Sequence, residues 1–331
     1  MKVAVFSTRQ YDQEYLDKYN TGHNLTYFNE PLTAATVKMA EAFDAICLFV
    51  NDKADKHTME ELARCGVKLI ALRSAGFNNI DLHAAAANHI KVVRVPAYSP
   101  QAVAEHAVAL ILTLNRKTHK AYNRVRESNF SLEKLLGFNL FGKTVGVIGT
   151  GKIGNCFCHI MLGFGCKVLA FDIAPFEELK QYGVIYTSLD ELLQQSDIIS
   201  LHCPLTPETR HLIDKAALAK MKTGAMLINT SRGAVISTKD VIKALKTGKL
   251  GYLGIDVYEQ EEHLFFKDLS EKVILDDLIA RLMTFPNVLI TAHQGFFTRE
   301  ALQEIATTTF RSLDQFENGQ KLENEIALNL T

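Results

Sequence analysis

The 331-residue sequence has no excess of charge of either sign and little proline. Lysine and arginine number 36 against 37 aspartates and glutamates, which gives a formal net charge of -1. A protein that binds by neutralising many phosphates carries a basic excess or a basic stripe, and neither is visible here. We therefore expect no nucleic-acid partner. With only 7 prolines, 47% hydrophobic and 22% charged residues, the chain is typical of globular proteins with large cores.

The cysteines show no pairing pattern. The six are scattered, without C-x-x-C spacing and without a histidine cluster beside them: Cys47, Cys65, Cys156, Cys158, Cys166 and Cys203. This distribution argues against both a zinc knuckle and a disulfide framework. We expect no metal site and a reducing, cytoplasmic setting.

Long apolar segments are also missing. The first apolar run, residues 1–6, is too short for the core of a signal peptide and is better interpreted as a strand. The longest apolar region, residues 107–114, lies between charged residues and is far shorter than a membrane span. We expect no membrane partner, and we find no internal repeat or low-complexity tract.

Short apolar runs alternate with amphipathic stretches, which is typical of parallel α/β architecture. The length corresponds to about two domains of roughly 150 residues each. Strands are predicted in a first set at 3–6, 25–28, 45–50, 68–72 and 92–95, and in a second set at 143–148, 167–171, 184–186, 198–201, 226–229, 252–257 and 288–291. Between the sets, Pro96 and Pro100 interrupt regular structure, so we predict a hinge there.

Helix signals lie between these strands. A helix is predicted over 55–65, and a long one over 101–127 that would suit a dimer interface. Ser188 precedes Glu191 by three residues, a capping box that predicts a helix over 189–195. Ser237 and Gly248 frame a helix over 238–247, and Gly319 ends the last one, over 298–318.

A glycine-rich turn follows the strand at 143–148. It reads Gly149-Thr150-Gly151-Lys152-Ile153-Gly154 and precedes an amphipathic helix, the context that dinucleotide binding requires. Asp172 ends the next strand, 21 residues after Gly151, where a carboxylate would bind ribose hydroxyls. The alternative is a glycine turn beside an ordinary aspartate. Because a carboxylate there repels a 2′-phosphate and no Arg or Lys follows it closely, NAD is favoured over NADP.

Chemically useful side chains follow three later strands. Arg232 comes after the strand at 226–229 and could pair with a substrate carboxylate, although a structural salt bridge is an equal alternative. His293 follows the strand at 288–291, and His202 is the other histidine at such a position. A carboxylate partner would give an imidazole the properties of a general acid. The sequence alone leaves Glu259, Glu261 and Glu262 open for that role.

Several motifs, in this order along the chain, resemble the D-2-hydroxyacid dehydrogenase family. They are residues 73–81 (RSAGFNNID), 149–154 (GTGKIG), 202–206 (HCPLT), 229–233 (NTSRG), 256–261 (DVYEQE) and 292–293 (AH). The resemblance covers essentially the whole chain. One departure is Lys152, where the family often has Arg or His.

The resemblance implies roles for individual residues. Arg232 would bind and polarise a 2-oxo acid, His293 would be the general acid and base, and Glu261 its carboxylate partner. Cofactor contacts are implied at Gly149, Gly151, Lys152, Ile153, Gly154, Asp172, Cys203, Pro204, Thr209, Thr230, Ser231, Arg232 and Asp256. Substrate contacts are implied at the backbone of Ala75 and Gly76, at Tyr98 and at Arg232.

The implied architecture has two doubly wound parallel-sheet domains. A Rossmann NAD-binding domain would span 100–297, and a flavodoxin-like, discontinuous substrate domain would combine 1–99 with 298–331. Within the family, the turn at 256–261 and the segments 264–266 and 293–298 resemble fermentative members that reduce pyruvate to D-lactate with NADH, reversibly. The alternatives are the same chemistry on a bulkier 2-oxo acid and a non-catalytic NAD-sensing protein. A homo-oligomer, dimer or tetramer, is also expected.

Overall fold

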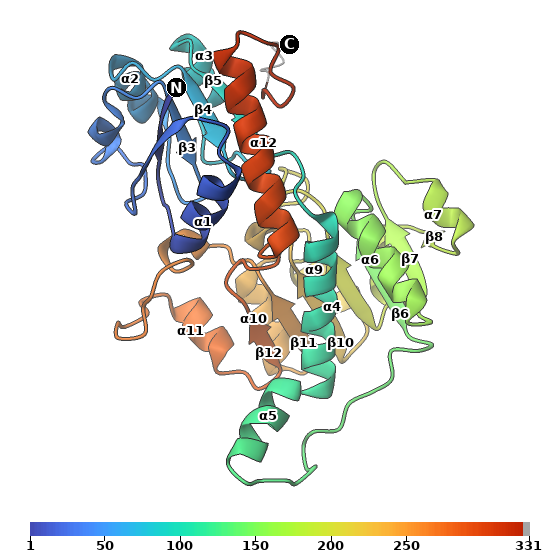
Figure 1. Cartoon of the computed structure of the whole chain (residues 1–331). Helices are drawn as coiled ribbons and strands as arrows, with labels where there is room; N and C mark the ends of the chain where they lie inside the picture. The colour runs from blue at the N-terminus through green and yellow to red at the C-terminus, as the bar shows by residue number, and fades with distance from the viewer. Residues whose placement is uncertain (327–331) are drawn as a thin grey trace. The chain divides into compact units, whose positions relative to one another are not determined.

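The computed structural model describes residues 1–326, and the chain divides into two compact units. The first unit combines Met1–Ser99 with Phe297–Thr331, of which 327–331 lie outside the described residues, and the second is Pro100–Phe296. Each unit is an open parallel sheet with helices packed on both faces (Figure 1). The two-sheet α/β fold class predicted from the sequence is therefore confirmed.

The first unit contains a five-stranded sheet in the order β2-β1-β3-β4-β5. Its strands are β1 (Lys2–Val5), β2 (Asn24–Tyr27), β3 (Ala45–Leu48), β4 (Leu69–Leu72) and β5 (Lys91–Arg94), and all neighbours pair in parallel. This is the strand order of flavodoxin-like folds, as expected.

Helices cover both faces of this sheet. They are α1 (Gln10–Tyr19), η1 (Val37–Ala40), α2 (Lys56–Arg64), α3 (Leu82–Ala87) and α12 (Arg299–Glu317). Side chains of η1, α2 and α3 form one apolar layer with the strands, and α1 and α12 form the other. The last helix of the chain thus completes the unit that the first 99 residues begin.

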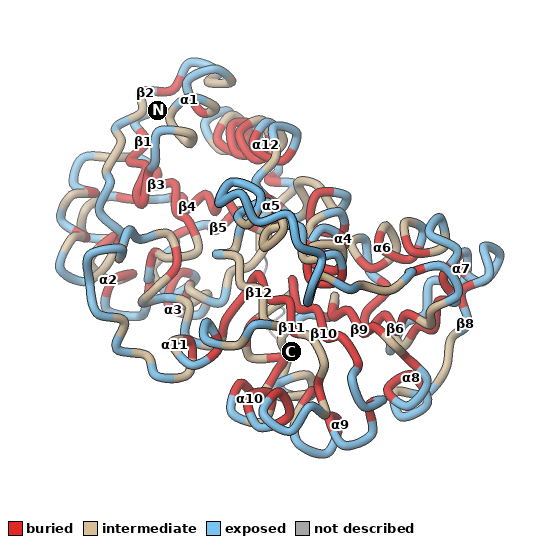
Figure 2. Tube along the Cα trace, turned by 90° about the horizontal axis from the view of Figure 1, so that it is seen from below, coloured by how far each residue is buried: buried red, intermediate tan, exposed pale blue. Residues whose placement is uncertain are grey.

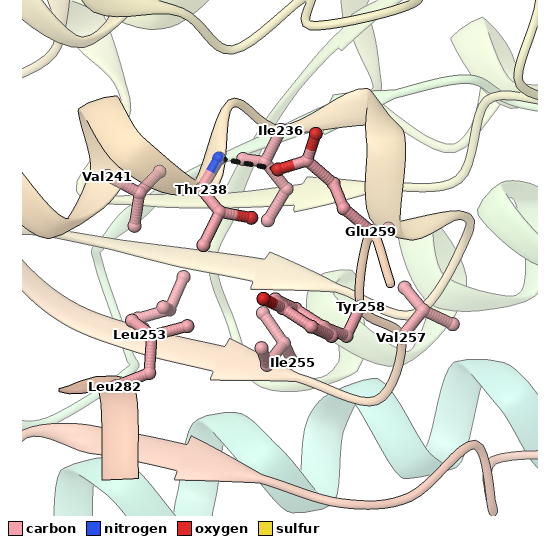
Figure 3. Close-up of a pocket in the computed structure, with 10 residues that line it drawn as sticks. Ile236, Thr238, Val241, Leu253, Ile255, Val257, Tyr258, Glu259 and Leu282 are labelled. Carbon is pink, nitrogen blue, oxygen red and sulfur yellow. Dashed lines mark hydrogen bonds between the residues drawn. The ribbon is translucent and has the colours of Figure 1, made fainter. Parts of the chain in front are cut away.

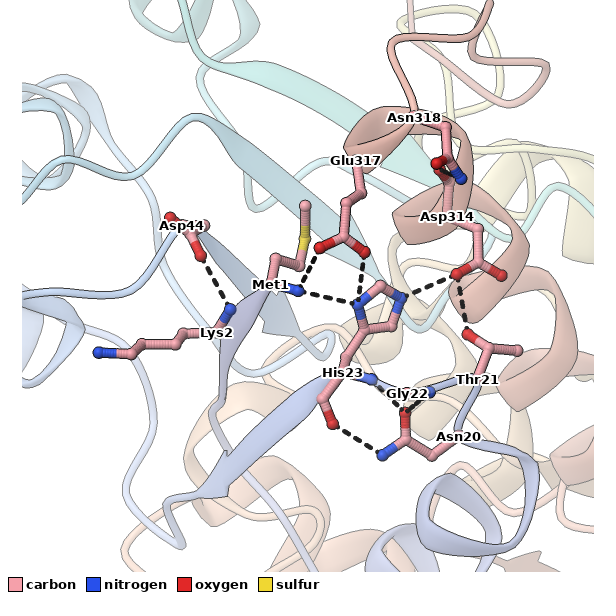
Figure 4. A network of polar contacts seen from close by, with 10 residues as sticks. All are labelled: Met1, Lys2, Asn20, Thr21, Gly22, His23, Asp44, Asp314, Glu317 and Asn318. Carbon is pink, nitrogen blue, oxygen red and sulfur yellow. Dashed lines mark hydrogen bonds and ion pairs between the residues drawn. The ribbon is translucent and has the colours of Figure 1, made fainter.

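A polar network joins the end of α12 to the N-terminus (Figure 4). The α-amino group of Met1 donates to Glu317 Oε1 at 2.5 Å. The ring of His23, whose side chain is 2% exposed, lies between Glu317 and Asp314, with Nε2 3.1 Å from an Asp314 oxygen. Because charge-assisted bonds are stronger than neutral ones, these contacts hold the C-terminal helix against the first strands.

The second unit contains a seven-stranded sheet in the order β12-β11-β10-β9-β6-β7-β8, with all neighbours parallel. Its strands are β6 (Thr144–Ile148), β7 (Lys167–Phe171), β8 (Ile185–Tyr186), β9 (Ile198–Leu201), β10 (Ala225–Asn229), β11 (Leu250–Ile255) and β12 (Val288–Ile290). The order reverses between β6 and β9. In open α/β sheets, ligands bind at such a switch point, outside the carboxyl ends of the strands.

Two helical layers enclose this sheet. The helices are α4 (Pro100–Arg116), α5 (Thr118–Arg126), α6 (Lys152–Gly163), α7 (Glu178–Gln181), α8 (Leu189–Gln195), α9 (Lys215–Lys220), η2 (Gly233–Val235), α10 (Thr238–Lys246), η3 (Glu261–His263) and α11 (Asp277–Met283). α4 and α6 pack on one face, and α8 to α11 on the other. Figure 2 shows the central strands β9 and β10 as buried, which matches their residue-by-residue burial.

The predicted strands are present, most of them shifted by one or two residues, but the single helix predicted over 101–127 is wrong. Lys117 has a left-handed backbone, with φ of 51°, and separates α4 from α5. Its Nζ donates to the carbonyls of Lys134 and Leu136 at 2.9 and 3.0 Å. The contacts of one side chain with a distant loop thus accompany a break that helical periodicity does not reveal.

The helix-end predictions differ in outcome. The capping box of Ser188 with Glu191 is present, Gly248 has the left-handed backbone that suits a helix end, with φ of 73°, and Gly319 after the last helix has a φ of 63°. Ser237 precedes α10, yet its side chain does not cap the helix, and the amide of Thr238 donates instead to a Glu259 oxygen at 2.9 Å.

Within residues 1–326, no helix is both long and apolar enough to cross a membrane.

Candidate active site

The glycine turn between β6 and α6 fits a dinucleotide phosphate. Gly149 has a φ of 92°, and a Cβ there would lie 2.6 Å from the Cys203 nitrogen. A Cβ on Gly154 would lie 1.9 Å from the Gly149 carbonyl oxygen, so only glycine lets α6 approach the turn this closely. At Gly151 no other atom of residues 1–326 lies within 4 Å of the Cβ position. The protein therefore packs closely against Gly149 and Gly154, whereas the space beside Gly151 is open. The amides of Lys152 and Ile153, which follow Gly151 and begin α6, are available to bind a phosphate.

Asp172 lies at the end of β7 beside this turn. Its Oδ2 accepts from the amide and the hydroxyl of Thr150, at 2.5 and 3.1 Å, and its Oδ1 accepts from the Ala174 amide at 2.9 Å. A carboxylate has about four acceptor sites, so one remains in addition to these three. The carboxylate is held in place with capacity left for a ribose hydroxyl.

Most of the remaining predicted cofactor residues follow β9 and β10, and Asp256 follows β11. Burial raises the pKa of the Cys203 thiol to about 11, so it remains neutral. The Thr209 hydroxyl donates to the Pro204 carbonyl at 2.6 Å and folds its own loop. The Thr230 hydroxyl is buried and has no hydrogen-bond partner within the part of the chain that is described. Such an orphaned polar atom suits a site that receives a polar ligand.

Arg232 projects from a turn that Asn229 organises. The Asn229 side chain accepts from the amide and the hydroxyl of Ser231, at 3.0 and 2.8 Å, and donates to the Arg232 carbonyl at 2.9 Å. Within residues 1–326, the only hydrogen bond of the Arg232 guanidinium is to its neighbouring carbonyl, that of Ser231, at 2.7 Å. The backbone of this turn is fixed while the end of the arginine stays available for an anion.

His293 and Glu261 form a pair. Nδ1 of His293 lies 2.9 Å from Glu261 Oε1, and the other oxygen of Glu261 accepts from the Tyr258 amide at 2.9 Å. A carboxylate at Nδ1 favours the tautomer with the proton on that nitrogen, which leaves Nε2 to exchange a proton with a substrate. The ring of Phe266 lies 5.9 Å from the imidazole, centroid to centroid.

Asp256 holds the loop that carries His293. It is 2% exposed, and its oxygens accept from the Thr291 hydroxyl at 2.5 Å and from the amides of Gln294 and Gly295 at 2.9 and 2.8 Å. His106 of α4 lies 3.3 Å from the same carboxylate. Burial raises the pKa of Asp256, but the hydrogen bonds from His106, Thr291 and Gln294 outweigh it and the pKa is lowered. Its contact with the cofactor stays a prediction.

The structure separates the alternatives that the sequence left open. His202 is half-buried, its Nε2 lies 2.9 Å from the Ser200 hydroxyl, and burial lowers its pKa to about 3, so this imidazole is neutral. Glu259 contacts Nε2 of His211 at 2.6 Å and the Thr238 amide. Of the two remaining glutamates, Glu261 is the one placed against His293.

A small, largely apolar pocket lies beside the turns that carry Arg232 and Glu261 (Figure 3). Gly233 comes from the turn of Arg232, and Tyr258 and Glu259 come from the turn that leads to Glu261. A Cβ on Gly233 would lie 2.0 Å from the Tyr258 carbonyl carbon. The two turns therefore pack backbone to backbone, and glycine is required between them.

The predicted substrate loop lies in the first unit, after β4. Its carbonyl groups are engaged: the Ala75 oxygen accepts from Arg94 Nη1, and the Gly76 oxygen from the Ser74 hydroxyl, both at 2.8 Å. The amides of Ala75 and Gly76 donate to no acceptor within residues 1–326. Free amides on a loop at the carboxyl edge of a sheet suit an anion. Tyr98 is half-buried just before the end of the first stretch of this unit.

Sequence reasoning missed the residues that support these groups. His106, Thr291 and Arg94 lie far along the chain from the groups that they hold, and no spacing or motif connects them. The Asn229 that begins the NTSRG motif was part of a recognised pattern, but its function as the organiser of the turn appears only in the hydrogen bonds.

The glycine turn, the strand-end aspartate and the reversal of strand order define the second unit as a dinucleotide-binding fold of the dehydrogenase class. The chain matches the family described as "D-isomer specific 2-hydroxyacid dehydrogenase, NAD binding domain" over residues 108–295. It is 53% identical to a D-lactate dehydrogenase of Escherichia coli (strain K12) over 328 residues, which cover 98% of this chain and 100% of that protein.

Solved structures agree with this match. The apo-structure of the E. coli D-lactate dehydrogenase has a TM-score of 0.91 at 50% identity, covering 99% of this chain and 100% of that one. A D-lactate dehydrogenase of Aquifex aeolicus, solved with NAD and lactic acid, has a TM-score of 0.84 at 38% identity and covers 96% of both chains. The chain belongs to the D-isomer-specific 2-hydroxyacid dehydrogenase family, and it is an NAD-dependent oxidoreductase.

Proposed function

We propose that this enzyme reduces pyruvate to D-lactate with NADH, reversibly, and serves fermentation. The observation that carries the proposal is the contact of Glu261 with Nδ1 of His293, which leaves Nε2 for proton exchange. Arg232 follows β10, the neighbour of the strand that leads to Glu261, and supplies a cation for the acid group. The choice of substrate is supported by the full-length similarity to proteins named for D-lactate and by the lactic acid found in one of them.

Each residue of the proposed site has its own function in the reaction. NADH, when bound at the glycine turn and Asp172, supplies the hydride that reduces C2 of the 2-oxo acid. His293 protonates the carbonyl oxygen from Nε2, and Glu261 stabilises the imidazolium that delivers this proton. Arg232 holds the carboxylate and stabilises negative charge at the carbonyl oxygen as it develops. In the reverse direction His293 accepts the proton from the hydroxyl of D-lactate.

We further propose that the first unit is the substrate domain and that the Ala75 and Gly76 amides bind the substrate carboxylate, with Tyr98 near the substrate. The two amides without acceptors support this assignment. The remaining cofactor contacts, at Lys152, Ile153, Cys203, Pro204, Thr209, Thr230, Ser231 and Asp256, are part of the same proposal. The cytoplasmic location stays a prediction.

We also propose a homo-oligomer, dimer or tetramer, but not through α4. The apolar side chains of α4 are largely buried in its own unit. The segment after it exposes large apolar side chains, with Leu132 83% and Leu136 86% exposed. Exposed apolar groups in such number are typical of contact surfaces. Light scattering after size-exclusion chromatography tests this, and a monomer at micromolar concentration contradicts it.

The test of the function is the initial rate of NADH oxidation with pyruvate, beside branched and aromatic 2-oxo acids and beside NADPH. We expect the highest kcat/KM with pyruvate and NADH, and D-lactate as the product. If a bulkier acid has the higher kcat/KM, the proposed mechanism stands and the assignment of pyruvate as the substrate is wrong. Tight NADH binding without turnover of any acid would contradict the proposed reduction of a 2-oxo acid and favour an NAD-sensing protein.

A further inference from the structure

The peptide between Ala75 and Gly76 has its two polar groups in different situations. Its carbonyl oxygen, on Ala75, accepts from Arg94 Nη1 at 2.8 Å. Its N–H, on Gly76, has no acceptor in the described part of the chain. In a trans peptide these two groups point in opposite directions, so a bond that fixes the carbonyl also fixes the direction of the N–H.

We propose that Arg94 is a positioning residue for the 2-oxo acid: its guanidinium orients the Ala75–Gly76 peptide so that the Gly76 amide receives the substrate carboxylate. The inference rests on the proposed function, in which this amide binds the carboxylate. Arg94 acts through the peptide and needs no contact with substrate.

The base of the Arg94 side chain is rigid. Arg94 is the last residue of β5, paired in register with Leu72 of β4, the strand that leads into the loop. The next amide, that of Val95, donates to the Ser74 carbonyl at 3.2 Å. On its other side the Arg94 amide donates to the Asn324 carbonyl at 3.2 Å. Backbone hydrogen bonds therefore connect β5 to β4 and to Ser74, immediately before the Ala75–Gly76 peptide.

The guanidinium is fixed as well. It lies over the ring of Phe77, 5.1 Å from the centroid, in a cation–π contact. Phe77 follows Gly76 directly, so one charged group contacts the loop both through the ring of Phe77 and through the carbonyl of Ala75. The Ser74 hydroxyl braces the following carbonyl, that of Gly76. Both carbonyls of the turn are therefore held by donors from the protein.

A cation on the carbonyl also strengthens the amide as a donor. Hydrogen bonds in a chain polarise one another, and the bond from Arg94 is charge-assisted. The Gly76 N–H becomes a better donor toward a carboxylate, without a positive charge placed in contact with the substrate. Arg94 is expected to affect binding of the acid and to leave NADH binding, which involves the other unit, unchanged.

The experiment compares the unmodified protein with Arg94→Met, Arg94→Lys and Arg281→Met. Methionine keeps part of the apolar stem of Arg94 and removes its charge and donors, and lysine keeps the charge. Arg281 of α11 is the matched control, because it makes the same kind of cation–π contact in the other unit, over the ring of Phe285 at 5.2 Å. For each variant, kcat and KM for pyruvate, Kd for NADH, Kd for oxamate in the NADH complex, and Tm are measured.

We expect Arg94→Met to raise the KM for pyruvate and the Kd for oxamate by about tenfold or more, the effect of losing a charge-assisted hydrogen bond. Its kcat, Kd for NADH and Tm should stay close to those of Arg281→Met. Arg94→Lys should have a KM between those of Arg94→Met and the unmodified protein.

Two results would overturn the proposal. One is a KM for pyruvate and a Kd for oxamate that agree in Arg94→Met and Arg281→Met. The other is a rise in KM that is accompanied by an equal loss of NADH affinity, which indicates a general structural role. Both differ from failure of the proposed function, which would appear as absence of turnover in the unmodified protein with every 2-oxo acid.

Discussion

Replacing Gly233 with alanine should separate the two turns that carry Arg232 and Glu261. An ideal Cβ at this position lies 2.0 Å from the Tyr258 carbonyl carbon, 2.3 Å from its oxygen and 2.4 Å from the Glu259 nitrogen. All three atoms belong to the backbone, so no side-chain rotation relieves the contact. Because real Cβ contacts are longer than 3.0 Å, the turns must move apart by about 1 Å.

A displacement of about 1 Å in catalytic groups costs on the order of 10²-fold in rate. We therefore expect Gly233→Ala to lower kcat/KM for pyruvate by about 10²-fold. Overpacking should destabilise the fold by only about 1–3 kcal/mol, so the protein still folds. NADH affinity should change less than kcat/KM, since most of the proposed cofactor contacts, including the glycine turn and Asp172, follow other strands.

The assay is steady-state kinetics with pyruvate, together with Tm and a fluorescence titration of NADH. Gly163→Ala is the matched control: Gly163 is the last residue of α6, and in the described part of the chain nothing lies within 4 Å of its Cβ position. Alanine there should be neutral or stabilise the protein by up to about 1 kcal/mol. The reasoning is refuted if Gly233→Ala keeps kcat/KM within about twofold of this control.

Three further outcomes are expected. Gly154→Ala places a Cβ 1.9 Å from the Gly149 oxygen, so α6 must leave the turn and the Kd for NADH should rise by tenfold or more in a fluorescence titration. Glu261→Gln removes the charge that stabilises the His293 imidazolium, and kcat at neutral pH should fall by about 10²-fold or more with unchanged NADH binding. The pKa of Asp256 is lowered from 3.8, so its contribution to stability is present above pH 3.8 and is lost as the pH falls through the lowered value. The Tm of Asp256→Asn should therefore lie below that of the unmodified protein at pH 7, and the two should converge below pH 3.8; a difference independent of pH contradicts this.

The parts of the fold that follow from local chemistry were predictable from the sequence. The β6 strand, the glycine turn and Asp172 form a pattern within one short stretch of the chain, in which each residue type has a local reason. The end of α12 shortly before Gly319 follows in the same way from a left-handed backbone that glycine adopts easily. Strand ends shifted by a residue or two because pairing with neighbours decides them.

The parts that depend on contacts across the fold were not predictable. The break at Lys117 accompanies contacts of its side chain with residues 17 and 19 positions away. The residue pattern alone left Glu259, Glu261 and Glu262 open, and only the family resemblance favoured Glu261; the tertiary structure places Glu261 2.9 Å from a histidine 32 residues later. Arg94 carries no motif of its own, and its contact with Ala75 arises from the pairing of β4 with β5.

The central claim is that His293 delivers the proton when a 2-oxo acid is reduced. The most direct measurement is D-lactate formed from pyruvate and NADH by the unmodified protein and by His293→Gln, with NADH affinity determined for both. The account predicts D-lactate from the unmodified protein, loss of nearly all turnover in His293→Gln, and equal NADH affinities. Undiminished turnover in His293→Gln, or loss of NADH binding in proportion to activity, would contradict it.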